Sequence, residues 1–291
     1  MCDRKAKVLR SLFLLLAWTL QFGLSCAAQD LKRGATGEIG TLEKSLKDPS
    51  WEQRCSAFYG LLGYVNCVEW DGRTDLIHSK LATFFRAHPD RQDDMKIALI
   101  ALLTTENKNV ETSKTLSEGY TNYYGDVVAA VSSLRDSRAL MALVGAVGTG
   151  GMATGALAEF GAASLDPVLH ELQSHDSIVR AAAVRAINEF LEPAYRKGFS
   201  DGVSRQKIKA ALLQAGADDD YGVRFTAVRG LAKIVDADTL GMLKKLASSD
   251  PAKLPGKATD GGDVLYPVRR AAKKALDQIE QSRSSTPTSP N

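Results

Sequence analysis

The chain of 291 residues has few of the side chains that build catalytic and metal centres, with only four histidines and four cysteines. Its formal net charge of +3 is too small to indicate the concentrated basic field of a nucleic-acid-binding protein. No segment shows the strict alternation of apolar and polar residues that is typical of strands. These absences favour a helical protein that does not bind DNA or RNA.

The candidate chemical motifs are weak. Five helical steps place His170 and His175 on different faces of a helix, whereas the two histidines of a zinc helix stand at i and i+4 on one face. The aspartates at 218–220 lack the alternation and trailing glutamate of a calcium loop and are better explained as a helix N-cap. Residues 148–153 match G-x-G-x-x-A without the preceding strand that dinucleotide binding requires, so we expect a turn between helices. We therefore expect no catalytic residue, no metal and no cofactor.

The N-terminus differs in kind from the rest of the chain. Basic residues precede an uncharged, mostly apolar run at residues 12–24, and small residues follow it, an order typical of a secretory signal peptide. The run is shorter than the about 20 residues that a membrane-spanning helix needs. We expect a cleaved signal peptide at residues 1–28 and an exported, periplasmic or secreted mature chain that starts near Gln29. An alternative is a lipid-anchored envelope protein, because the residues before Cys26 partly match the lipobox that precedes an acylated cysteine.

Cys55 and Cys67 remain in the mature chain, and two cysteines in an exported protein invite a disulfide. A helix from Cys55 to about residue 65, rising ~1.5 Å per residue, would hold them farther apart than the ~7 Å limit between bridged Cα atoms. We therefore expect two unpaired cysteines, with a bridge only if Gly60 or Gly63 ends the helix early.

The main signal is an internal repeat. The segments VRAAAVRAI, VRFTAVRGL and VRRAAKKAL share the pattern V-R-x-x-A-x-x-[AG]-[LI]. Their arginines, Arg180, Arg224 and Arg269, are 44 and 45 residues apart, a period typical of two-helix repeats. A fourth copy, QRCSAFYGL, contains Arg54 and loses only the valine.

Each of the last three copies places small and large apolar residues on one helical face and follows a second amphipathic segment, at residues 165–172, 208–213 and 240–246. A helix pair of this kind cannot bury its apolar stripe alone, so neighbouring pairs must stack. Residues 153–157 keep the same spacing without the arginine. The pattern predicts an all-α solenoid of about seven stacked two-helix repeats.

The solenoid is expected to span residues 29–280. Long polar interruptions at residues 107–121 and 251–266 are expected to be loops. Residues 281–291 contain no large apolar side chains that could be buried and are expected to form a disordered tail.

The repeat resembles HEAT repeats over roughly residues 39–280, in particular the short kind found in phycobilisome lyases and exported bacterial proteins. In that family the motif arginine pairs with an aspartate ahead of the second helix, and the pairs stack as a ladder. Asp176 and Asp220 stand four residues before Arg180 and Arg224, where each can also cap the helix.

The other two motif arginines fit the ladder less well. Arg54 follows Asp48 loosely, and no aspartate stands at the required spacing before Arg269. The resemblance therefore implies a ladder whose last rung departs from the family pattern.

A second basic residue follows three of the motif arginines by five positions, namely Arg185, Arg229 and Lys274. Five helical steps turn a side chain about 140° away, so these residues cannot belong to the ladder. The resemblance implies that the second helix of each pair lines a concave surface, where the three residues would form a basic stripe facing an anionic partner.

We therefore expect an exported, non-enzymatic protein-binding scaffold whose partner is another exported or envelope protein. The alternatives from other classes are a lyase-like HEAT enzyme or carrier acting on a bound small ligand, and a structural envelope lipoprotein.

Overall fold

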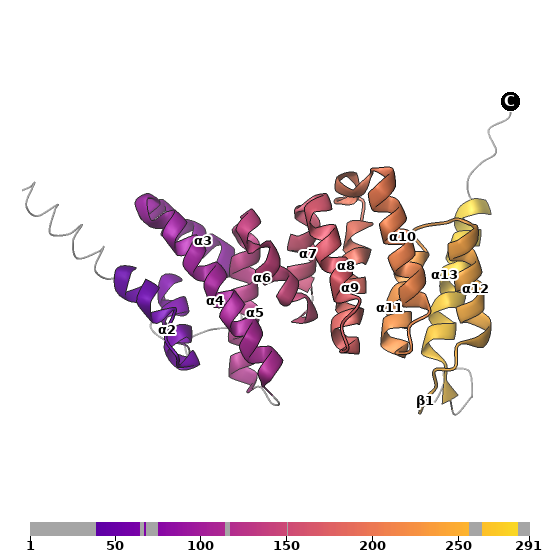
Figure 1. Cartoon of the computed structure of the whole chain (residues 1–291), viewed down its shortest axis with the longest axis horizontal. Coiled ribbons are helices and arrows are strands. Elements are labelled where there is room, and N and C mark those ends of the chain that lie inside the picture. Colours follow the sequence, from indigo (N-terminus) through magenta and orange to yellow (C-terminus); the bar gives the residue numbers. More distant parts are fainter. Residues whose placement is uncertain are drawn as a thin grey trace, which may run out of the picture. The chain divides into compact units, whose positions relative to one another are not determined.

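The computed structural model describes residues 39–64, 67, 75–113, 117–149, 151–255 and 264–284. The chain divides into two compact units, one up to Asp71 and one from Gly72 onward. The described residues are almost entirely helical, as predicted (Figure 1). The predicted signal peptide, Cys26 and residues 285–291 lie outside the described ranges.

The first unit contains a helix at residues 39–45 and α2 (Trp51–Leu61). Ser50 caps α2 by accepting a hydrogen bond from the Gln53 amide at 3.4 Å. The helix ends at Leu61 because Gly63 adopts a left-handed conformation with φ of 78°, which reverses the chain.

This reversal brings Cys67 back to Cys55, and a disulfide joins them with their Cα atoms 5.8 Å apart. The expectation of two unpaired cysteines is therefore wrong. It assumed a helix continuing to about residue 65, whereas the structure contains the alternative in which the helix ends early at Gly63.

The second unit begins with α3 (Asp75–Ala87) and continues as pairs of helices, with a short 3₁₀ turn before several of the helices. The first helices of the pairs are α4 (Gln92–Thr112), α6 (Leu140–Gly145), α8 (Leu165–Glu171), α10 (Gly202–Gly216) and α12 (Ala237–Ser249). The second helices are α5 (Glu118–Ser133), α7 (Gly151–Glu159), α9 (Ser177–Phe190), α11 (Tyr221–Leu231) and α13 (Pro267–Ser284). The 3₁₀ turns are η2 (Pro89–Arg91), η3 (Ser137–Ala139), η4 (Val147–Thr149), η5 (Gly161–Ser164) and η6 (Arg196–Phe199).

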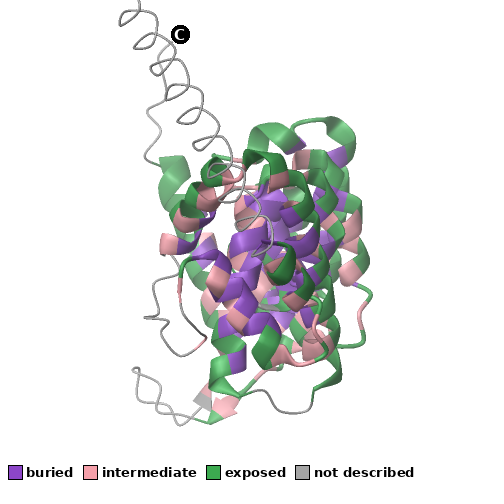
Figure 2. Cartoon of the chain, turned by 90° about the vertical axis from the view of Figure 1, so that its left-hand side faces the viewer, coloured by how far each residue is buried: buried purple, intermediate pink, exposed green. Residues whose placement is uncertain are grey.

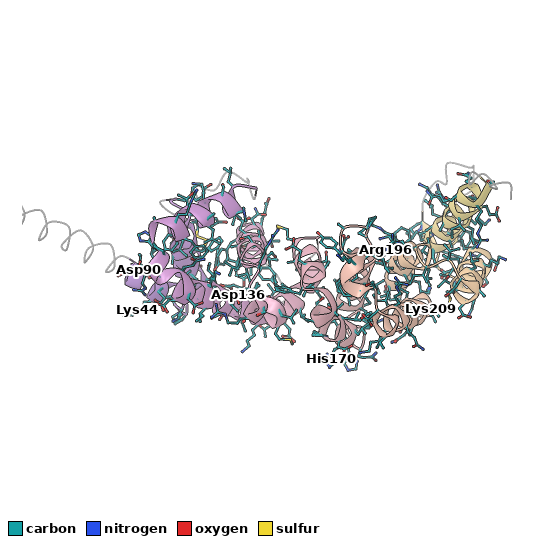
Figure 3. The ribbon with its side chains drawn as sticks, turned by 90° about the horizontal axis from the view of Figure 1, so that it is seen from above. Lys44, Asp90, Asp136, His170, Arg196 and Lys209 are labelled. Carbon is teal, nitrogen blue, oxygen red and sulfur yellow. A yellow bond between two sulfur atoms is a disulfide. The ribbon has the colours of Figure 1, made fainter. Side chains whose placement is uncertain are left out.

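These helices pack in two rows (Figures 1 and 3). The second-helix row runs α3, α5, α7, α9, α11, α13, each packed on the next, and the first-helix row contains α4, α6, α8, α10 and α12. Figure 3 shows His170 of α8 at the edge formed by the first-helix row. Buried residues gather where the helices face one another (Figure 2). The pairs α8/α9, α10/α11 and α12/α13 confirm the repeats predicted from the arginine motif.

The polar segment that begins at Asn107 is not a loop at its start, because α4 continues to Thr112. Its first polar side chain is bonded within the fold: Asn107 donates to the Ala142 carbonyl at 2.8 Å and accepts from the Tyr124 hydroxyl at 2.6 Å. Paired in this way, polar residues do not interrupt a helix.

Two further expectations need correction. Residues 251–266 include two short strands, β1 (Leu254–Pro255) and β2 (Val264–Leu265), which pair antiparallel with Leu254 opposite Leu265. The expectation of a disordered tail from residue 281 is wrong for residues 281–284, because α13 extends to Ser284. Among the residues that the structure describes, no helix is long and apolar enough to cross a bilayer.

Candidate binding surface on the second-helix row

The motif arginines link consecutive pairs at the start of the second helices. Arg180, in the first turn of α9, binds Asp218 from Nε to Oδ2 at 2.9 Å and from Nη2 to Oδ1 at 2.8 Å. Its Nη1 donates to the carbonyls of Ser174 and His175 at 3.0 and 3.2 Å. Asp218 lies in the turn before α11, so the arginine of one pair holds the turn of the next.

Arg224 repeats this arrangement one pair later. It binds Asp250 from Nε to Oδ2 at 2.6 Å and from Nη2 to Oδ1 at 3.2 Å, and its Nη1 donates to the carbonyls of Asp218 and Asp219, both at 2.8 Å. The side chains of Arg224 and Asp250 are only 9% and 1% exposed. Burial alone would raise the pKa of Asp250, but hydrogen bonds from Arg224 and the Ala252 amide hold that pKa below its ordinary value.

The two aspartates join the arginines into one continuous network. The side chain of Asp218 accepts from Arg180 while its main-chain carbonyl accepts from Arg224. In the same way, the side chain of Asp250 accepts from Arg224 while its carbonyl accepts from Nε of Arg269 at 2.6 Å. The network therefore runs from α9 through α11 to α13.

The first and last motif arginines also contact main-chain carbonyls. Arg54 donates to the carbonyls of Asp48 and Pro49 at 2.7 and 2.8 Å, and Arg269 lies over the ring of Tyr266 at 4.4 Å in addition to its bond to Asp250. The doubt about the last rung is thus resolved by a carbonyl and an aromatic face in place of a carboxylate.

Asp176 and Asp220 do not pair with Arg180 and Arg224, which corrects the expected ladder. Asp176 caps α9 by accepting from the Ile178 amide at 2.8 Å, and Asp220 caps α11 by accepting from the amides of Gly222 and Val223 at 2.8 and 3.1 Å. An aspartate at the N-cap is fixed by the first amides of its own helix, so the arginine reaches the next pair instead.

The basic residues five positions after the motif arginines lie at equivalent positions of α9, α11 and α13. Arg185 and Lys274 are exposed, and the Arg229 side chain is 60% exposed. Neither Arg185 nor Lys274 has an ion-pair partner among the described residues. We call these three residues the basic stripe.

Glu192, which follows α9, partly neutralises the basic stripe. Its Oε1 accepts from Arg229 Nη2 and forms an ion pair with Lys233 Nζ at 2.8 Å. The hydrogen bond from Lys233, followed by that from Arg229, lowers the pKa of Glu192 below its ordinary value. Glu192 is therefore ionised at neutral pH and competes with any anion for Arg229.

Large apolar side chains accompany the basic stripe on the same helices. Ile178 of α9 and Tyr221 and Phe225 of α11 are 66%, 43% and 48% exposed. Phe225 and Arg229 are four residues apart and share one face of α11. A surface that combines exposed aromatic and basic side chains resembles the core of a protein interface more than an ordinary solvated surface.

On the preceding second helices, α7 and α5, small residues occupy the position that the basic stripe occupies on α9, α11 and α13. Aligning α7 on the repeat by its buried residues 153–157 places Gly155 where Arg185 stands in α9, and the same alignment of α5 places Ala129 there. The surface is hollowed at this point. Two adjoining hollows of about 310 and 400 Å³ share five lining residues, which are Ser132, Arg135, Ala156, Glu159 and Tyr195.

Sequence reasoning missed Asp218 and Asp250 as the partners of the arginines. A partial signal existed for Asp218, because an aspartate stands six residues before both Arg54 and Arg224, at Asp48 and Asp218, and the main-chain carbonyls of these aspartates accept from those arginines. No such signal exists for Asp250, which the β1–β2 hairpin separates from Arg269. The hollow between α5 and α7 left no mark in the sequence beyond glycine and alanine.

His170 and His175 are both exposed and do not meet in the fold. Across the described ranges, no group of three or more His, Cys, Asp or Glu side chains is placed to hold a metal ion. Cys26, the residue named for lipid attachment, lies outside the described ranges.

Comparison with solved structures finds designed repeat proteins. One is a designed armadillo repeat protein with 18% identity and a TM-score of 0.42, covering 82% of this chain and 98% of that chain. Another, a designed armadillo repeat protein in complex with the peptide (KR)4, has 17% identity and a TM-score of 0.38, covering 82% of this chain and 98% of its own.

None of the curated proteins compared with the chain matches it. The sequence pattern of HEAT repeats matches residues 165–258, the stretch that contains α8 to α12 and the contacts of Arg180 and Arg224. Residues 165–258 of this chain are therefore similar to HEAT repeats, the family that the arginine motif resembles.

Proposed function

We propose that the chain is a non-enzymatic scaffold that binds an extended acidic segment of a partner protein across its second-helix row. The observation that carries the proposal is the register of the basic stripe: Arg185, Arg229 and Lys274 occupy one equivalent position on three successive helices. Equivalent positions on stacked helices recur at a regular spacing, which suits a ligand that crosses the helices and meets each in turn.

The chemistry of the surface defines the segment. Basic side chains attract carboxylates, and the exposed Tyr221 and Phe225 offer apolar contact beside them. Crossing from α5 to α13 at about 8–10 Å per helix corresponds to roughly 10–12 residues of extended chain. The proposed partner segment is thus about that long, acidic, and interrupted by apolar residues.

The proposed binding should depend on salt concentration. Arg185, Arg229 and Lys274 are exposed, so their attraction for a carboxylate is screened within about 8 Å at physiological ionic strength. Binding should weaken as salt rises, mainly through the rate of association.

The experiment is a selection of displayed random peptides of about twelve residues on the full chain. The proposal expects the enriched peptides to be acidic and to lose affinity when Arg185, Arg229 and Lys274 are all changed to glutamine. The matched control changes Arg205, Lys244 and Lys245 to glutamine, because these exposed residues carry the same charge on the first-helix row. Failure to enrich acidic peptides, or equal loss in both triple variants, would contradict the proposal.

We also propose that the chain is exported. The order of basic, apolar and small residues before Gln29 supports this, and so does the Cys55–Cys67 disulfide, because such bonds persist in oxidising compartments. N-terminal sequencing of the chain recovered from a bacterial host with an active secretion pathway tests it. A chain that starts near Gln29 is expected, an acylated Cys26 at the N-terminus would indicate the lipoprotein alternative, and an uncut cytoplasmic chain would contradict export.

A further inference from the structure

Gly155 is a helical glycine that no close packing contact requires. It stands inside α7, where glycine weakens a helix relative to alanine, and a Cβ atom added there would meet no atom within 4 Å. Gly230 of α11 shows the contrast, because a Cβ there would lie 2.3 Å from Asn188 Oδ1. Close helix packing therefore explains Gly230, whereas Gly155 leaves space open on the surface side.

Arg135, which lines both hollows, also departs from local preference. Its φ of 49° is left-handed, a conformation that the residue after a helix usually reaches with glycine or asparagine. The Arg135 side chain is 76% exposed, and its Nε lies 3.2 Å from Glu159 Oε2. No other ion-pair partner of Arg135 occurs among the described residues, so its two Nη groups remain available to a carboxylate.

Gly155 and Arg135 line the same hollow. A residue kept against its backbone preference and a glycine kept without a packing reason both line the hollow between α5 and α7. Local preferences give way most often where a surface serves something outside the fold. The hollow, which lies on the same row as the basic stripe, is therefore a candidate contact for the same segment.

The lining defines what the hollow can take. Gly155 and Ala156 contribute no large side chain to the lining, which also contains Tyr195 and Met152, the latter 43% exposed. Thioether sulfur and aromatic rings favour contact with an aromatic side chain. The guanidinium group of Arg135 can donate hydrogen bonds to a carboxylate next to that side chain.

We propose that this hollow is the anchor site of the bound segment, receiving an aromatic side chain over Gly155 while Arg135 binds an adjacent carboxylate. The inference rests on the proposed function and adds the position and chemistry of its main contact. Charge complementarity supports an acidic occupant, because the two hollows and a third, which shares His78 and Ser133 with the first, are lined by the cations Arg135 and Lys96 and by the single acidic residue Glu159.

The test uses peptides enriched on the full chain from the displayed random library. Gly155→Leu fills the hollow, and it should keep or raise the melting temperature because leucine favours a helix and the site is open. Affinity for the enriched peptides should fall at least about tenfold, as expected when an interface anchor is blocked. Gly241→Leu is the matched control, since Gly241 lies inside α12 on the first-helix row with nothing within 4 Å of an added Cβ atom.

A second variant separates the anchor from the fold. Arg135→Gly suits the left-handed backbone, so it should not lower the melting temperature, yet it should weaken peptide binding by about tenfold through loss of a charge-assisted contact. The enriched peptides should also share an aromatic residue beside an acidic one.

The outcomes distinguish the two proposals. If Gly155→Leu and Arg135→Gly bind the peptides as the unmodified chain does while the basic-stripe variant does not, the anchor site is wrong and the proposed function stands. If no acidic peptide is enriched at all, both fail.

Discussion

Arg224 and Asp250 form a buried ion pair between two consecutive helix pairs, with Nε of the arginine 2.6 Å from Oδ2 of the aspartate. The pair joins the start of α11 to the end of α12, and the carbonyl of the same aspartate binds Arg269 at the start of α13. One carboxylate therefore couples two repeats of the array. In a solenoid, where each repeat contacts only its neighbours, such links carry much of the cooperativity.

The first prediction concerns Asp250→Ala. It leaves the buried guanidinium of Arg224 without its carboxylate, so it should lower the free energy of unfolding by about 3 kcal/mol. Asp219→Ala is the control, because Asp219 also binds a motif arginine but its side chain is 94% exposed, and its loss should cost at most about 1 kcal/mol. Urea unfolding followed by circular dichroism measures both, and equal costs would contradict a special role for the buried pair.

The second prediction is a pH dependence. The pKa values of Asp218 and Asp250 are held below their ordinary value because hydrogen bonds from Arg180 and Arg224 outweigh the opposing effect of burial. Their stabilisation is full above the unfolded-state value of about 3.9 and is lost as pH falls through the lower folded-state value. The urea midpoint should therefore fall below about pH 4, and less steeply in Asp250→Asn than in the unmodified chain. Parallel profiles for the two proteins would argue against this origin.

The third prediction separates capping from ion pairing at Asp220. Because this carboxylate accepts from two amides of α11, Asp220→Ala should cost about 1 kcal/mol, whereas Asp220→Asn, which still caps, should cost much less. Thermal melts of the two variants measure the difference. Should asparagine be as damaging as alanine, charge would matter more than the cap.

The fourth prediction concerns Glu192, which holds Arg229 and Lys233. Glu192→Gln removes the competing carboxylate and should tighten binding of enriched acidic peptides by about two- to fivefold, the value of an exposed ion pair. Glu171→Gln, which makes the same charge change on α8 of the first-helix row, should leave affinity unchanged. Weaker binding after Glu192→Gln would indicate that Glu192 itself contacts the peptide.

The repeat and its helix pairs could be predicted because the motif is local. The spacing of Arg180, Arg224 and Arg269 and the apolar faces around them are properties of short segments, and the pairs α8/α9 to α12/α13 follow from them. The caps at Asp176 and Asp220 follow for the same reason, because a cap depends only on the next few residues.

The partners of the arginines could not be predicted, because they depend on how one repeat stacks on the next. Asp250 reaches Arg224 from 26 residues away, a distance set by packing and not by sequence spacing. The Cys55–Cys67 bridge depended on a single left-handed residue, Gly63, which sequence reasoning allowed without favouring. The hollow at Gly155 depends on side chains of three helices meeting, which no single segment encodes.

The most direct test of the central claim is photo-cross-linking of an enriched acidic peptide to the full chain. The peptide carries a benzoylphenylalanine in place of its aromatic residue, and mass spectrometry identifies the attachment points. The account predicts attachment to the second-helix row, at α7 beside Gly155 or at Met152 and Tyr195, with loss of that product in Gly155→Leu. Attachment mainly to α8, α10 or α12 would contradict it, because those helices form the opposite row.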